Sequence, residues 1–307
     1  MGSPVALVRE RRFSTMGSYG HLIVVGGPEG LADRGVERLD LLESRWSRFR
    51  SNSELSQLNA AGGEPMLVSA DTVVLIDALR RAWQLTAGRF DPTVLDAMCD
   101  LGYAASWPDV ASPLWLPKPH PTPGCGGVDL HAERGLVQLP PGVHLDPGGL
   151  GKGLAADLVA TELAEAAEGV LVNVGGDLRV MGRPPEGAAW VVGIEHPDPG
   201  MGDLARLELA DGGVATSTSA RRRWESADGT PLHHLVDPRT GRPAERQWRQ
   251  VTTISATAWW AEVLAIVAFL DGELGDDSAA ALVIDADGGT RTLGDPRWFA
   301  VDPEPVR

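Results

Sequence analysis

A glycine-rich segment between a short extended run and a helical run is the strongest constraint on how this chain folds. It reads Asp146-Pro147-Gly148-Gly149-Leu150-Gly151-Lys152-Gly153, after a strand pattern at 143–146 and before a helical pattern that reaches about residue 167. Glycines at such a junction let the backbone approach a ligand, and N–H groups at a helix start suit an anion such as a pyrophosphate. The segment is not a Walker A loop, because Asp146 and Gly153 stand where that motif needs Gly and Ser or Thr. The alternative is a tight turn that only packs the helix on a sheet.

Strand and helix patterns alternate along the rest of the chain. Helical spacing covers 31–49, 69–86, 152–167 and 258–270, and Ser69 is a candidate N-cap of the second helix. Strands are expected at 169–174, 190–195, 204–209, 214–216 and 250–256, with a strand pair at 13–25 that turns at Tyr19-Gly20 and a closing hairpin at 282–293. This mixture predicts the α+β class, with mixed β-sheets and packed helices. Because no internal repeat or clear boundary occurs, residues 1–307 are expected to form a single unit.

Residues 107–127 differ in composition from the segments on either side. Six prolines fall between Pro108 and Pro123, and three glycines follow closely. Such a stretch predicts a loop or an insertion rather than packed helix or strand.

The charge balance narrows the classes of partner. The 307 residues include 27 basic and 42 acidic ones, a formal net charge of −15. Such a chain repels phosphate backbones over long range, so neither nucleic acid nor an anionic membrane is an expected partner. The most apolar stretch, 258–270, is interrupted by Glu262 and is too short to span a bilayer, and no apolar run near the start fits a secretion signal. We therefore expect no membrane insertion and a cytoplasmic location.

Several further segments combine turn residues with polar side chains that could bind a ligand. They are residues 88–93, 173–177, 214–223 and 233–241. Each also has a structural explanation: Asp91 is expected at an exposed corner, and the glycines of 173–177 suit a plain turn. Adjacent His233 and His234 point to opposite faces of a strand, so at most one of them faces a shared site. No zinc motif occurs, and a metal bound through oxygen ligands is more consistent with Mg²⁺ than with Zn²⁺.

These segments, taken in order, resemble the FAD:protein FMN transferase family, also called ApbE-like. The resemblance runs from about residue 13 to about residue 285, and its strength lies in the order and spacing of the pieces. The matching pieces are Met16-Gly17-Ser18, Ser47-Arg48-Phe49, Ser53-Glu54-Leu55-Ser56-Gln57-Leu58-Asn59, Gly88-Arg89-Phe90-Asp91-Pro92-Thr93, Leu145-Asp146 through Lys152-Gly153 with Asp157, Asn173-Val174-Gly175-Gly176-Asp177, Ala215-Thr216-Ser217, His234-Leu235-Val236-Asp237-Pro238-Arg239-Thr240-Gly241 and Val251-Thr252-Thr253-Ile254.

The resemblance implies a flavin transferase fold with a T-fold-like core and a Mg²⁺-dependent reaction. Such enzymes take FAD as substrate and pass FMN to a threonine or serine hydroxyl of an acceptor flavoprotein, releasing AMP. The residues that the resemblance places at FAD are Met16, Phe49, Arg89, Phe90, Asp91, Asp146, Lys152, Thr216 and Val236. It gives catalytic roles to His234, Lys152 and Asp237, while the general base stays open between His234 and a carboxylate.

The expected metal ligands depart from the family pattern. The Gly149 carbonyl fits, but Glu262 stands where the family usually has Asp, and Ile266 stands where it usually has a ligating Thr. The Ala265 carbonyl is the nearby replacement, since hard cations accept backbone oxygens. Two alternatives remain beside transfer: hydrolysis of the FAD pyrophosphate to FMN and AMP, and flavin binding without turnover.

Overall fold

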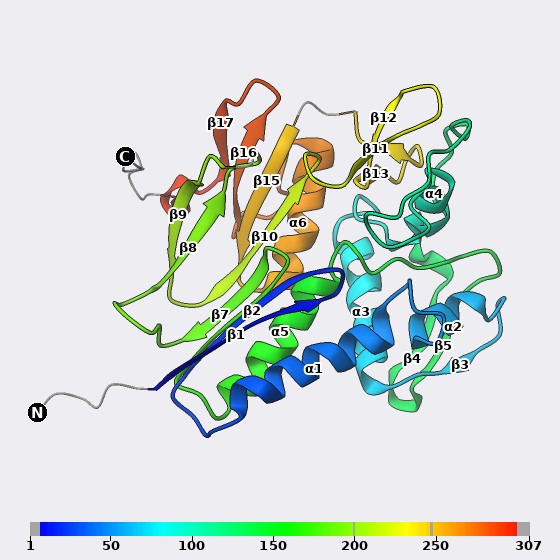
Figure 1. Ribbon diagram of the computed structural model, residues 1–307. Coiled ribbons are helices and arrows are strands. Elements are labelled where there is room, and N and C mark those ends of the chain that lie inside the picture. Colours follow the sequence, from blue (N-terminus) through cyan, green and yellow to red (C-terminus); the bar gives the residue numbers. More distant parts are fainter. Residues whose placement is uncertain (1–6, 199, 246–247, 300–307) are drawn as a thin grey trace, which may run out of the picture.

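An eight-stranded antiparallel β-sheet forms the centre of the protein (Figure 1). The computed structural model describes residues 7–198, 200–245 and 248–299. The expectation about a secretion signal concerns the start of the chain, whose first six residues lie outside these ranges. Every neighbouring pair of strands in this sheet is antiparallel. In spatial order the strands are β1 (Val8–Thr15), β2 (Ser18–Val25), β6 (Gly169–Val174), β7 (Asp177–Gly182), β10 (Gly212–Thr218), β15 (Trp248–Ser255), β16 (Ala280–Asp285) and β17 (Thr290–Gly294).

Both faces of the sheet are covered, and the alternation of side chains along β6 shows how. Val170 and Val172 enter the core beneath helices α5 (Gly151–Ala164) and α6 (Ala258–Asp271). Leu171, between them, enters the second core, which the hairpin β8 (Trp190–Glu195) and β9 (Asp203–Leu209) closes from the other side. Residues i and i+2 of a strand share one face, and residue i+1 points to the opposite face. The side chains of β6 therefore enter both cores.

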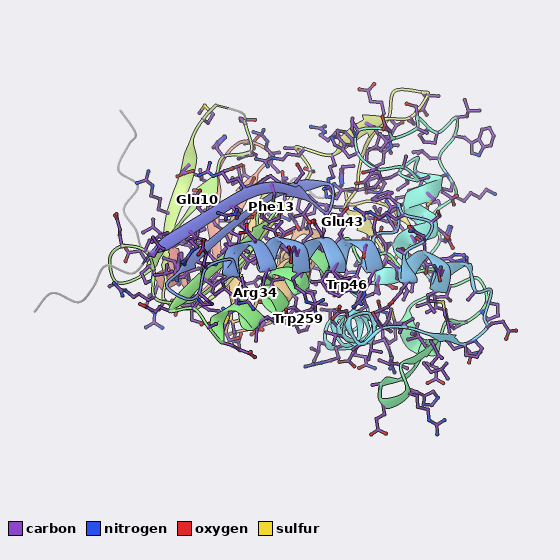
Figure 2. All side chains as sticks on the ribbon, turned by 60° about the horizontal axis from the view of Figure 1, so that its bottom comes forward. Glu10, Phe13, Arg34, Glu43, Trp46 and Trp259 are labelled. Carbon is purple, nitrogen blue, oxygen red and sulfur yellow. The ribbon has the colours of Figure 1, made fainter. Side chains whose placement is uncertain are left out.

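Helix α1 (Leu31–Trp46) runs along β1 and extends the helical layer (Figure 2). Leu39, Leu42 and Trp46 are its buried stripe, as the helical spacing predicts. Near its end, the Glu43 carboxylate accepts a hydrogen bond from the Met16 N–H at 2.7 Å, which ties the β1–β2 turn to the helix.

A second group of smaller elements lies beyond the end of α1, to the right in Figure 1. Ser69 caps α3 there by accepting the Thr72 N–H, which confirms the expected N-cap. The elements are α2 (Glu54–Ala60), α3 (Ala70–Leu85), α4 (Leu95–Asp100), the sheet of β3 (Met66–Leu67), β5 (Leu136–Gln138) and β4 (Asp129–His131), and the pairs β11 (Arg223–Glu225) with β12 (Pro231–His233) and β13 (Val236–Asp237) with β14 (Arg242–Pro243). Single 3-10 turns occur at Pro92–Val94, Cys125–Gly127, Ala132–Arg134 and Pro296–Phe299.

Two local expectations are wrong. The β1–β2 turn lies at Met16 and Gly17, which have positive φ angles, whereas Tyr19 and Gly20 lie inside β2. Residues 143–146 form no strand: the Asn59 side chain bonds both the N–H and the carbonyl of Leu145, and so takes the place of a neighbouring strand.

Residues 107–124 form neither helix nor strand, and backbone hydrogen bonds hold part of this segment against the 236–241 turn. The N–H groups of His120 and Thr122 donate to the carbonyls of Thr240 and Pro238 at 3.0 and 2.8 Å.

Elsewhere in the described ranges, Cys99 and Cys125 are free thiols. Within the same ranges, no helix is both long and apolar enough to cross a bilayer.

Helices α5 and α6 approach each other closely where α6 begins. Both oxygens of Asp157, on α5, accept the first N–H groups of α6, from Ala258 and Trp259, at 3.0 and 2.8 Å. A Cβ atom added at Gly153 would lie 2.6 Å from the carbonyl of Ala258. The α5–α6 contact therefore has no room for a side chain at residue 153.

We expect Gly153→Ala to lower the free energy of unfolding by about 1–3 kcal/mol or more, because the clash is with backbone that cannot rotate away. Chemical denaturation measures the change. Gly126→Ala is the matched control: its Cβ would meet only Trp83, at an ordinary 3.6 Å, so its midpoint is expected to stay near that of the wild type. Equal midpoints for the two variants would contradict the close approach of the helices.

Candidate functional site

A large cavity opens where the start of α5, the ends of the central strands and the loops of the second group meet. Its volume is about 1090 Å³. It takes in nearly all the residues that the sequence singled out, although these come from segments spread over most of the chain. Those that line it are Met16, Phe49, Arg89, Phe90, Asp91, Asp146, Gly149, Lys152, Thr216, His234, Val236 and Glu262. Asp237 and Ala265 are not among the lining residues.

The glycine-rich segment makes one wall of this cavity and leads directly into α5. Asp146 is buried, with its N–H on the Pro92 carbonyl at 2.7 Å and its side chain accepting the Gly148 N–H at 2.7 Å. The Asp146–Gly148 bond and the bonds from the Leu150 and Gly151 N–H groups to the Pro147 carbonyl form a tight turn that ends where α5 begins. The segment thus joins a turn to a helix N-terminus at the cavity, the arrangement that suits an anion.

Lys152 lies at the floor of the cavity between two buried carboxylates. Its Nζ donates to Asp177 Oδ2 and, at 2.5 Å, to Glu262 Oε1. Burial alone would lower the pKa of Lys152, but the two carboxylates outweigh it and raise that pKa above its ordinary value. Burial, followed by the charge of Asp177, raises the pKa of Glu262.

His234 follows strand β12 and is the one histidine of the adjacent pair that lines the cavity. Its Nδ1 is buried and has no hydrogen-bond partner among the described residues. Burial, helped by the charge of Arg222, lowers the pKa of His234 to about 3, so the ring is neutral at pH 7. His233 instead bonds the Ala244 carbonyl at 3.2 Å, outside the cavity.

At the cavity wall, Arg48 and Tyr103 form a cluster with Phe49, and of these three only Phe49 was predicted as part of the site. The Arg48 guanidinium lies 4.1 Å from the Phe49 ring centroid and 4.8 Å from that of Tyr103. It also pairs with Asp146 at 3.1 Å, and both side chains are only 6% exposed. Arg48 stands beside Phe49 in the matching motif, so the sequence could have indicated that it lies near the site. Its ion pair with Asp146, almost a hundred positions later, could not be predicted from the sequence.

Of the acidic residues of the predicted site, Asp91 lies differently from its expected position, whereas Asp237 lies at a turn, as its segment predicts. Asp91 is buried rather than at an exposed corner, because it accepts hydrogen bonds from Thr93 and from the Thr122 hydroxyl. Asp237 is held by Arg239, with Nη2 to Oδ2 at 2.6 Å, and forms the turn that follows β13.

Arg89 connects this turn to the end of α6. Its Nε and Nη2 bind the Asp271 carboxylate, the second at 2.5 Å, while its Nη1 is buried and has no hydrogen-bond partner within the described ranges. The carboxylate of Asp237 is 3.8 Å from Nη1.

The carboxylates around Lys152 supply part of a ligand set for a hard divalent cation. Asp177 and Glu262 place two carboxylate oxygens around one cation, the Lys152 ammonium, and carboxylates are the ligands that Mg²⁺ prefers. The described residues contain no group of three or more His, Cys, Asp or Glu side chains suited to a metal. A Cβ at Gly149 would lie 2.7 Å from the Ile266 side chain, so an apolar group faces this turn. The set therefore fits a cation that takes its remaining ligands from substrate phosphates and water, as Mg²⁺ commonly does.

Comparisons with known proteins identify the family of this chain. The chain belongs to the ApbE family, whose model matches residues 16–293. The FAD:protein FMN transferase of Escherichia coli K12 is 38% identical over 247 residues, which are 74% of this chain and 67% of that protein. The one from Vibrio cholerae serotype O1 is 28% identical over 282 residues, 84% of this chain and 80% of that protein. A crystal structure of the ApbE protein from Thermotoga maritima matches with a TM-score of 0.82 at 26% identity, covering 96% of this chain and 100% of that one. These matches confirm the resemblance drawn from the motifs and the predicted α+β fold.

Proposed function

We propose that this chain is an FAD:protein FMN transferase that moves FMN from FAD to a threonine or serine hydroxyl of an acceptor flavoprotein and releases AMP. The main observation behind the proposal is that a neutral, buried His234 and the ammonium of Lys152 line the same cavity. Family membership supports it, since the curated relatives carry this activity in their names.

The cavity suits FAD in size and in the kinds of group that line it. At about 1090 Å³ it is slightly larger than most ligand pockets, whose volumes reach about 1,000 Å³. Phe49 offers a ring that is 41% exposed, on which a flavin or an adenine can stack. The start of α5 and Lys152 offer positive charge to the pyrophosphate.

The proposed reaction is one displacement at phosphorus. The acceptor hydroxyl oxygen forms a bond to the phosphorus of the FMN half, the bond from that phosphorus to the bridging oxygen breaks, and AMP leaves with the bridging oxygen. In this proposal His234 takes the hydroxyl proton: its ring is neutral and its Nδ1 has no hydrogen-bond partner among the described residues. The negative charge of a bound pyrophosphate would raise the low pKa of this ring toward the range of a general base. Lys152 balances negative charge on the phosphate oxygens.

Mg²⁺ is proposed to bind through Glu262, with Asp177 beside it, and to supply charge stabilisation at the pyrophosphate. The backbone carbonyls of Gly149 and Ala265 remain proposed ligands; Gly149 lines the cavity and Ala265 is buried in α6. Asp237 is proposed to act on the reaction indirectly, by holding the 236–241 loop that carries Val236.

Release of AMP from FAD tests whether the chain turns FAD over. The purified protein, FAD and Mg²⁺ are incubated with and without an acceptor flavoprotein, and AMP is measured by chromatography. Transfer predicts AMP that depends on both Mg²⁺ and the acceptor. AMP that forms equally without the acceptor indicates hydrolysis of FAD. If the protein binds FAD but releases no AMP under any condition, the proposal that it is an enzyme is refuted.

A further inference from the structure

We infer that Lys152 is a built-in competitor of the divalent cation: in the FAD-free protein its ammonium occupies the space between Asp177 and Glu262, and the metal enters only when FAD draws the lysine away. The inference rests on the proposed function, because it requires FAD and a cation to share this cavity. It adds an order of binding to that function.

The two carboxylates are fixed independently of the lysine. The second oxygen of Glu262 accepts the Gly153 N–H at 2.8 Å, and Oδ1 of Asp177 accepts the Thr216 N–H at 3.3 Å. Asp177 lies in the buried strand β7 and Glu262 in the buried face of α6. Both carboxylates can therefore keep their places if the ammonium leaves.

Lys152 is the member of this group that can move. Its side chain is 18% exposed, against 3% for Asp177 and 5% for Glu262, and it lines the cavity. A lysine carries its charge on four flexible methylenes, so Nζ can shift by several ångströms without a change in the helix. A pyrophosphate bound at the start of α5 would lie on the exposed side of this lysine.

The charges favour the exchange. One ammonium between two carboxylates leaves a net charge of −1, whereas a divalent cation between them leaves none. When FAD binds, its two phosphate charges attract the ammonium, and the vacated carboxylates attract the metal. Binding of FAD and of metal should then strengthen each other by the same factor, as linkage requires.

Metal binding, rather than catalysis, tests this exchange. Mn²⁺, a hard cation visible by electron paramagnetic resonance, is titrated into the wild-type protein without FAD and with saturating FAD. We expect binding at least about tenfold tighter with FAD. In Lys152→Met without FAD, we expect Mn²⁺ to bind at least about tenfold more tightly than in the wild type without FAD, because the competing charge is gone.

Lys118→Met is the matched control, since Lys118 is the only other lysine and is exposed outside the cavity. It should leave every Mn²⁺ affinity unchanged. Equal affinity of the wild type with and without FAD, or no gain in Lys152→Met, overturns the inference. If Lys152→Met does not fold, the two wild-type titrations decide alone. A titration of FAD without metal, followed by flavin fluorescence, distinguishes failure of this inference from failure of the proposed function. If FAD does not bind, the proposed function is refuted. The comparison of Mn²⁺ binding between the wild type and Lys152→Met, both without FAD, still tests whether the lysine competes with the metal.

Discussion

Replacing Arg48 by alanine is expected to lower the free energy of unfolding by about 3–5 kcal/mol, the cost of removing one partner of a buried ion pair. Arg48 and Asp146 are each only 6% exposed, so the Asp146 carboxylate would remain buried without its counter-charge. The change also removes the guanidinium from the rings of Phe49 and Tyr103. Denaturant unfolding followed by tryptophan fluorescence measures the loss.

Arg50→Ala is the control for this prediction. Arg50 lies two residues away and pairs with Glu43, but its side chain is 48% exposed, and exposed pairs contribute about 1 kcal/mol or less. The double change Arg48→Ala with Asp146→Ala should recover part of the loss, because it removes both charges. A loss for Arg48→Ala no larger than that for Arg50→Ala would show that the buried pair does not stabilise the fold.

Replacing His234 by glutamine is expected to lower the rate of FMN transfer by about 10²–10⁴-fold, the usual contribution of a general base. The affinity for FAD should change little, because the role assigned to the ring is to accept a proton from the acceptor hydroxyl. Single-turnover transfer and a fluorescence titration of FAD measure the two quantities separately.

His233→Gln provides the matched control, since its side chain bonds the Ala244 carbonyl and does not line the cavity. Its transfer rate should stay within a few-fold of that of the wild type. If His234→Gln transfers FMN at the wild-type rate, a carboxylate or the phosphate itself must take the proton instead.

The large elements could be predicted from the sequence because their burial patterns are simple. Strand β6 is a short apolar run bounded by glycine, and α6 is an apolar helix of the expected length. Strand β7 was missed, because it carries the charged residues Asp177 and Arg179, both buried. Arg179 pairs with Asp157 on α5 and with Asp211, and a sequence pattern does not reveal such compensation.

Most of the residues that the motifs single out line one cavity, but the contacts between them could not be predicted. Lys152 meets Asp177 and Glu262 across 25 and 110 residues of sequence, and each of these residues alone has a plain structural explanation. The resemblance places Lys152 at FAD and gives it a catalytic role, and in the structure it also bonds two carboxylates. The burial of Asp91 could not be predicted, because its hydrogen-bond partner Thr122 lies 31 residues away, in the proline-rich segment.

Mass spectrometry of an acceptor flavoprotein incubated with this protein, FAD and Mg²⁺ tests the central claim most directly. The account predicts a gain of one FMN mass on a threonine or serine of the acceptor, matched by released AMP. The gain should be abolished by EDTA, by Asp146→Ala in the transferase and by alanine at the acceptor hydroxyl. AMP release with no modified residue on an acceptor that a known FAD:protein FMN transferase does modify would contradict the account.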